Sequence, residues 1–264
     1  PTSGYLQLRS QKAMLAHKGE KNKMTIKIPK TTIIHGNPVA GAIDRVLSKS
    51  QNAPQQTAQP RVQNREGMIY IHSAGVYVAK QRTHLNEDWF QAHKSLASGG
   101  LRMPTIPEFI AYLKYLKEDP TNQEFQEIYN EITQVREPWR AEWLDADFKL
   151  VNGVLNINYN HTIQNGKLIP RNSEPLDGNT LMENRTPGIS LEDWLKFPTS
   201  QGFPRKDIVK GDLYYWAPMS DNNSVAGFYA DSVRAGLYCY RSPSGRNSGL
   251  GVFAVAEPKG NARP

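Results

Sequence analysis

The segment 223–255 holds the side chains with the clearest potential for chemistry. It contains two strand-like runs, 227–233 and 236–242. Because successive side chains of a strand point to opposite faces, each run divides into two rows. One row mixes glycine, tyrosine, aspartate, valine and serine, which follows no packing rule. Tyrosine and serine favour binding surfaces, since tyrosine offers a large contact area at low entropy cost. We expect this row to contact a ligand; an ordinary solvent-facing sheet is the alternative interpretation.

The same segment lacks five residue types altogether. Lys, Glu, Gln, Met and Trp number 56 in the chain, and all of them lie outside 223–255. At their density in the other 231 residues, about eight would fall among these 33. A preference for strand-forming residues removes some of the five types but not all of them. The composition therefore needs an explanation beyond the packing of a sheet.

Most kinds of catalytic or metal site find no support in the sequence. There is no GxSxG, P-loop or strand-linked GxGxxG motif. Cys239 is the single cysteine, which excludes an internal disulfide, and within GLYCYR it is typical of a small buried hydrophobe. The carboxylate pairs Asp145 with Asp147 and Glu192 with Asp193 are interpreted as solvated charges near helix ends. The six histidines have no metal-ligand spacing, so we expect no metal and no cofactor.

The elements that must position this segment begin with helices. A helix is predicted over 86–97, with Asn86 as its N-cap and Gly99 just beyond its end. In LRMPTIPEFIAYLKYL, Thr105 and Glu108 have the spacing of a capping box. The apolar residues that follow share one helical face, which indicates a helix packed on the core.

Two further helix starts are indicated. Thr121 and Glu124 have capping-box spacing and open a predicted helix over 122–135, whose apolar stripe ends at Val135. Ser190 is a candidate N-cap for a short helix in SLEDWLKF. Both apolar stripes are typical of core packing rather than of cofactor contacts.

Strands are predicted on both sides of these helices. The run 68–80 contains two β-type stretches. From 146 the apolar residues alternate with period two, and Asn152–Gly153 and Asn165–Gly166 are hairpin dipeptides. From Gly211 the chain is strand-like to its end. Helices come early and strands late, without βαβ alternation, so the fold class is α+β.

The net charge of +7 is concentrated at the N-terminus. Residues 1–66 carry seven Lys and four Arg against three acidic residues, which leaves the rest of the chain nearly neutral. The part 50–66 is rich in Gln and Pro and is typical of a linker. We interpret 1–66 as a solvated basic extension; nucleic-acid binding through it is the alternative and is less favoured. No membrane-spanning apolar run and no signal-peptide core are visible.

Two stretches resemble known families. LRMPTIPEFIAYL (101–113) is similar to the helix start R-L-P-T-x-x-E-W-E-Y-A of formylglycine-generating-enzyme-like domains, which have a C-type lectin fold. The run from Ser232 to the sequence NSGLGV resembles the ending of that superfamily. The residues that keep the helix pattern are Arg102, Pro104, Thr105, Glu108 and Phe109.

More specifically, 223–255 resembles the variable region of a diversity-generating retroelement protein. In that family an error-prone reverse transcriptase scrambles template adenines, most often in AAY codons. The NNY codons that result never encode Lys, Glu, Gln, Met or Trp, the five types missing here. The resemblance implies that the varied, ligand-binding positions are Gly227, Tyr229, Asp231, Val233, Gly236, Tyr238, Tyr240, Ser242, Gly245, Asn247, Gly249 and Phe253.

Together the resemblances imply a C-type lectin-like domain over 67–264 with variable region 223–255. The implied function is non-covalent recognition of a protein or glycan on a target surface, by a protein on a virus particle or a cell surface. Formylglycine-generating chemistry needs copper and a cysteine pair, and the single Cys239 excludes it. An enzyme of the same superfamily with a different site is the alternative.

Overall fold

The computed structural model describes residues 65–258. All of these residues belong to one compact unit. The predicted basic extension and linker, 1–66, lies outside the described residues except for its last two positions. Across 65–258, none of the helices has the length and apolar character needed to cross a bilayer.

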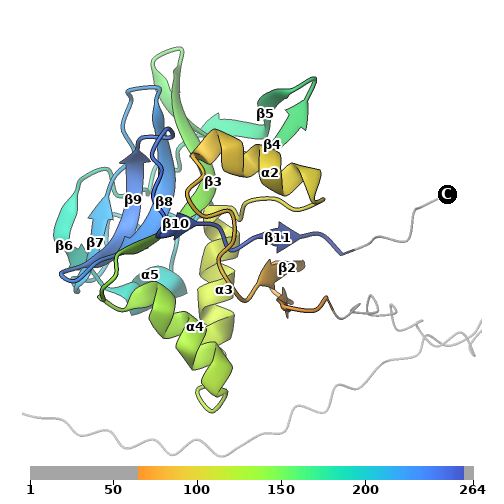
Figure 1. The fold of residues 1–264 in the computed structure, drawn as a ribbon. Coiled ribbons are helices and arrows are strands. Elements are labelled where there is room, and N and C mark those ends of the chain that lie inside the picture. The colour runs from red at the N-terminus through yellow and green to blue at the C-terminus, as the bar shows by residue number, and fades with distance from the viewer. Residues whose placement is uncertain (1–64, 259–264) are drawn as a thin grey trace, which may run out of the picture. The chain divides into compact units, whose positions relative to one another are not determined.

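The described residues form four helices and eleven strands, an α+β arrangement as the sequence predicts (Figure 1). Three helices follow the first hairpin and precede the other strands, and the fourth helix is inserted among those strands. In chain order the elements are β1 (Met68–Ile71), β2 (Val76–Ala79), α2 (Trp89–Ser98), α3 (Ile106–Glu118), α4 (Gln123–Thr133), β3 (Arg140–Val151), β4 (Val154–Gln164), β5 (Lys167–Pro175), β6 (Arg185–Ile189), α5 (Leu191–Lys196), β7 (Leu213–Trp216), β8 (Ser224–Ala230), β9 (Ala235–Arg241), β10 (Leu250–Gly251) and β11 (Val255–Ala256).

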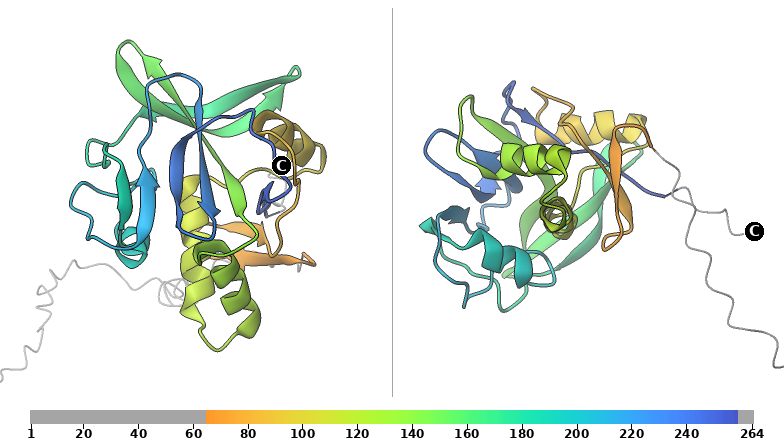
Figure 2. Two further views of the ribbon diagram at one scale, coloured as in Figure 1. Left: turned by 60° about the vertical axis from the view of Figure 1, so that its left-hand side comes forward. Right: turned by 90° about the horizontal axis from the view of Figure 1, so that it is seen from below.

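Two sheets organise these elements. The smaller sheet has the strand order β1-β2-β11, so a strand near the end of the described chain pairs with its first hairpin. The larger sheet has the order β5-β4-β3-β8-β9-β7-β6, with β10 also pairing with β3. The hairpin of β4 and β5 lies against α2 (Figure 2). Strand β8 therefore occupies the middle of the larger sheet, between β3 and β9.

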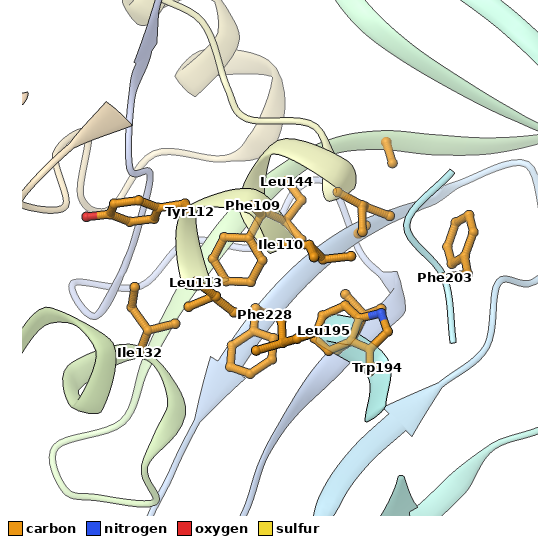
Figure 3. Packing of buried hydrophobic residues seen from close by; sticks show 14 of the residues in the cluster. Phe109, Ile110, Tyr112, Leu113, Ile132, Leu144, Trp194, Leu195, Phe203 and Phe228 are labelled. Carbon is orange, nitrogen blue, oxygen red and sulfur yellow. The ribbon is translucent and has the colours of Figure 1, made fainter. Parts of the chain in front are cut away.

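Helix α3 carries the centre of the core. Its N-cap Thr105 accepts a hydrogen bond from the Glu108 N–H, and the Glu108 carboxylate accepts from the Thr105 N–H, which confirms the predicted capping box. Phe109 packs against Phe228 of β8, with ring centroids 5.4 Å apart. Trp194 of α5 also lies beside Phe228, with ring centroids 6.3 Å apart and the rings nearly parallel (Figure 3). The inner side of β8 is thus fixed to two helices.

Two helix starts differ from the sequence-based prediction. Helix α2 is capped by Asp88, which accepts a hydrogen bond from the Gln91 N–H, and not by Asn86, whose φ of 62° is left-handed. Helix α4 is capped by Asn122 instead of Thr121. The Thr121 hydroxyl donates to Asp119 at 2.7 Å and so is engaged outside the helix. In both cases a neighbouring Asp or Asn is the N-cap residue, because its side-chain oxygen accepts a hydrogen bond from a free N–H group of the first turn.

Strand β3 begins at Arg140, six residues earlier than the alternation starting at 146 predicts. Residues 140–146 are all buried, and a strand covered on both faces shows no period of two.

The predicted hairpins are confirmed, since Asn152, Gly153, Asn165 and Gly166 all have positive φ, as type I′ turns require. The expected core position Val135 is wrong: it lies beyond the end of α4 and is 53% exposed.

The assignment of the α4 cap can be tested by mutation. Asn122→Ala removes the side-chain oxygen that accepts the Phe125 N–H, so we expect a loss of about 1 kcal/mol in the free energy of unfolding. Thr121→Ala is the matched control and should cost clearly less, because Thr121 is exposed and bonds only to Asp119. Urea denaturation of both variants measures the difference. Equal losses would contradict this cap.

Candidate ligand-binding face

Strands β8 and β9 divide their side chains between the core and the opposite face, as the alternation predicts. Phe228 pairs with Leu237, and both side chains are buried in the main core together with Cys239. Tyr229 pairs with Gly236, and Gly227 pairs with Tyr238, on the other face of the sheet. The pairing therefore brings Tyr229 and Tyr238 together, with ring centroids 6.2 Å apart.

A β-bulge in β9 alters this pattern at its end. Gly227 pairs with Tyr238, but Val225 pairs with Arg241, so the register shifts by one residue between them. The extra residue turns the following side chain to the other face. Strict alternation over the run 236–242 predicts that Arg241 lies in the same row as Leu237 and Cys239. The structure corrects this, because Arg241 lies on the face of Tyr238.

The face contains an aromatic pocket of about 350 Å³. Trp216 of β7 is its centre, with ring centroids 5.5 Å from Tyr229 and 5.2 Å from Tyr238. Tyr240 extends the aromatic surface and meets Tyr238 edge-on at 4.6 Å. The residues lining the pocket are Trp139, Trp216, Tyr229, Asp231, Arg234, Tyr238 and Arg241.

The two tyrosines in the pocket are uncharged hydrogen-bonding groups. Burial raises the pKa of Tyr229 and of Tyr238 above the ordinary phenol value. Their hydroxyl groups therefore stay protonated at neutral pH and can both donate and accept hydrogen bonds. An apolar wall with a few directed polar groups is the usual composition of a ligand pocket.

Arg241 supplies an unneutralised positive charge. Its guanidinium lies 5.2 Å from the ring centroid of Trp139 and 5.0 Å from that of Trp143, in cation–π contact with both. Among the described residues no carboxylate lies within 4.0 Å of it, and its buried Nε has no hydrogen-bond partner there. Burial lowers its pKa, but an arginine remains charged at neutral pH. The pocket thus offers a partly desolvated cation to an anionic group.

Asp231 and Arg234 form the rim at the β8–β9 turn. The Asp231 carboxylate accepts hydrogen bonds from the N–H groups of Val233 and Arg234 and from the Arg234 side chain. Burial opposes ionisation of Asp231, but these hydrogen bonds outweigh it and lower its pKa. Arg234 in turn lies over the ring of Trp216 at 5.8 Å. The predicted site residue Val233, at the tip of this turn, is 73% exposed.

The remaining predicted positions lie in the loop between β9 and β10. Ser242 and Asn247 are exposed, and Gly245 is half-buried. The loop is held near the start of α2, where Trp89 donates its backbone N–H to the Pro243 carbonyl. Arg246 also forms an ion pair with the α2 cap Asp88. These positions thus extend the surface from the aromatic pocket toward α2.

Three predicted glycine positions have no space for a side chain. A Cβ atom added at Gly227, Gly236 or Gly249 would lie 2.8, 2.3 and 2.3 Å, respectively, from a backbone carbonyl oxygen of a neighbouring segment. The prediction that their side chains vary and contact ligand is therefore corrected: close backbone approach requires glycine there. Gly245 is different, since its nearest contact, the Ser242 carbonyl, lies at 3.3 Å.

Phe253 is also corrected. Its side chain is 1% exposed and packs against Tyr112 of α3, with ring centroids 5.8 Å apart. Phe253 lies between β10 and β11, where the chain crosses the core, so the alternation of β8 and β9 does not extend to it. It belongs to the scaffold and not to the binding face.

The sequence missed Trp139, Trp216, Arg234 and Arg241 as pocket residues. The two tryptophans come from outside 223–255, so a search confined to that segment could not find them. A signal existed in LYYW, the sequence of β7, where Leu213 and Tyr215 are buried while the alternate residues are half-buried. Trp139 gave no such signal, because it stands just before β3.

Comparisons with known proteins do not assign this chain to a family. No protein-family model, no curated protein and no solved structure matches the chain. The interpretation of the face therefore depends on its residues alone.

The requirement for glycine at 236 is testable. Gly236→Ala places a methyl group against the Tyr214 carbonyl, and we expect a loss of roughly 1–3 kcal/mol in the free energy of unfolding. Gly178→Ala is the control, because Gly178 has no heavy atom near its Cβ position and no positive φ. It should leave stability unchanged or slightly raised. Thermal unfolding of both variants decides; an unaffected Gly236→Ala protein would show that the position tolerates side chains.

Proposed function

We propose that this chain is a ligand-binding protein that recognises a protein or glycan on a target surface through the face of β7, β8 and β9. The observation that carries the proposal is the aromatic pocket beside Tyr229 and Tyr238. Its walls come from three neighbouring strands and from the residue before β3, so the pocket is built on the regular part of the fold. Pre-formed aromatic pockets concentrate binding energy, because aromatic anchors dominate binding hot spots.

The charge of the pocket narrows the class of ligand. Arg241 presents a guanidinium without a carboxylate partner within 4.0 Å among residues 65–258. A planar guanidinium group can donate two parallel hydrogen bonds to the oxygens of one carboxylate or phosphate group. The favoured ligand therefore presents an anionic group, such as an acidic side chain or an acidic sugar, next to an apolar or ring surface.

We propose further that the side chains of this face vary between copies of the gene, as in variable proteins of diversity-generating retroelements with a C-type lectin fold. The missing residue types in 223–255 and the α+β order support this proposal. Of the twelve positions implied by the resemblance, four serve the scaffold. The eight that remain are Tyr229, Asp231, Val233, Tyr238, Tyr240, Ser242, Gly245 and Asn247.

The DNA downstream of the gene provides the test. We expect a near-copy of the 223–255 coding segment, followed by a reverse-transcriptase gene. The copy should carry adenines at the codons of the eight positions, because none of them belongs to the main core or to a close backbone approach. The codons of Gly227, Gly236, Gly249 and Phe253 should be identical in both copies, and they serve as the internal control.

Two findings would contradict the proposal. Absence of any repeat would remove the explanation of the composition by adenine scrambling. A repeat whose differences fall on buried codons such as those of Phe228 and Leu237 would separate the scrambled positions from the binding face.

A further inference from the structure

A second group of polar side chains lies buried away from the aromatic pocket. His93 of α2, Asp145 of β3 and His161 of β4 meet where the β4–β5 hairpin lies against α2. Their exposed fractions are 3%, 0% and 8%, respectively. Asp145 is thus not the solvated charge that its position in the sequence indicated. Each residue turns one potential ligand atom inward, and these atoms lie within 4.8 Å of one another.

The group is held from several sides. Asp145 accepts a hydrogen bond from the His161 backbone N–H at 2.9 Å, and its Oδ1 lies 2.5 Å from His161 Nδ1. Trp89 packs edge-on against both imidazoles, with centroids 4.3 Å from His93 and 5.0 Å from His161. The Trp89 indole itself donates to the Leu144 carbonyl. The side chains are therefore pre-oriented by packing and by hydrogen bonds.

One atom of the group lacks a partner. The Nε2 atom of His93 is buried, and no described residue hydrogen-bonds to it. Its nearest carboxylate oxygen, Asp145 Oδ1, is 3.6 Å away, too far for a hydrogen bond. A buried polar atom without a partner is costly and signals a missing group such as an ion.

We propose that His93, Asp145 and His161 bind a divalent transition metal ion of the zinc class. Two imidazole nitrogens and one carboxylate oxygen are a common ligand set for such ions. Tetrahedral zinc with bonds of about 2.0–2.1 Å separates its ligand atoms by roughly 3.4 Å. The separation of 3.6 Å between His93 Nε2 and Asp145 Oδ1 fits this value. His161 Nδ1 and Asp145 Oδ1, 2.5 Å apart, are closer than this, so on binding the metal replaces the hydrogen between them and the two atoms move apart.

The site borders a wide pocket lined by residues of α2, β4 and β5. This pocket has a volume of about 720 Å³, and both His93 and His161 line it. A metal between the two rings therefore has an entry path and a free coordination position toward the pocket. Within 65–258 this pocket shares no lining residue with the aromatic pocket. The metal site and the ligand-binding face are thus separate features.

The experiment uses the full chain without an affinity tag, titrated with Zn²⁺ and then dialysed for metal analysis. We expect one tightly bound zinc ion that depends on His93. With free zinc about 100-fold above Kd, the midpoint of thermal unfolding should rise by roughly 5–10 °C. His93→Phe keeps the ring packing against Trp89 and removes the unpaired nitrogen. It should abolish the zinc-dependent rise without lowering the midpoint of the metal-free protein.

His72→Phe is the matched control, because His72 is exposed and is not one of the three proposed ligands. It should bind zinc as the unsubstituted chain does. A metal-free chain with no zinc-dependent shift would overturn the proposal, as would equal zinc binding by both variants. Co²⁺ in the unsubstituted chain gives a readout that needs no variant. Strong visible absorption, as four-coordinate cobalt gives, would support the site. A spectrum no stronger than that of aqueous cobalt would overturn it.

Discussion

The packing of Phe228 between two helices is the contact on which the rest of the structure depends. Its ring packs with Phe109 of α3 and with Trp194 of α5. Because neighbouring side chains of a strand face opposite ways, fixing Phe228 inward fixes Tyr229 outward. The same register turns Leu237 inward and Tyr238 outward on β9. A one-residue slip would bury the binding face and expose the core.

This arrangement separates stability from recognition. The scaffold comprises the inward row, the capped helix α3 and the glycines at which strands approach closely. The outward row makes aromatic contacts within the pocket, and its innermost member, Tyr229, is 7% exposed and also packs in a second hydrophobic cluster with Trp143 and Val225. Arg241 belongs to this row only because a bulge in β9 shifts the register. The proposed diversification requires a face that can change its side chains while the backbone stays fixed.

Much of the fold could be predicted from local signals, whereas the sites depend on long-range contacts. Capping spacing at Thr105 and the Asn-Gly dipeptides gave one helix start and two hairpins correctly. The start of β3 was missed because a doubly buried strand has no alternation. The face of Arg241 was predicted wrongly because a bulge is a feature of the pairing between two strands and cannot be seen in the sequence of one. His93 and Asp145 are far apart in the chain, and only tertiary packing brings them together.

We expect the eight face positions to tolerate other side chains while the fold is retained, although Asp231 and Tyr229 make contacts within it. A display library with NNY codons at the eight face positions, sorted by resistance to proteolysis, tests it most directly. The control library randomises eight inward or glycine positions: Ala226, Gly227, Phe228, Ala230, Gly236, Leu237, Cys239 and Gly249. We expect most members of the face library to keep the parent's resistance to proteolysis and most members of the control library to lose it. Equal loss in both libraries would contradict it.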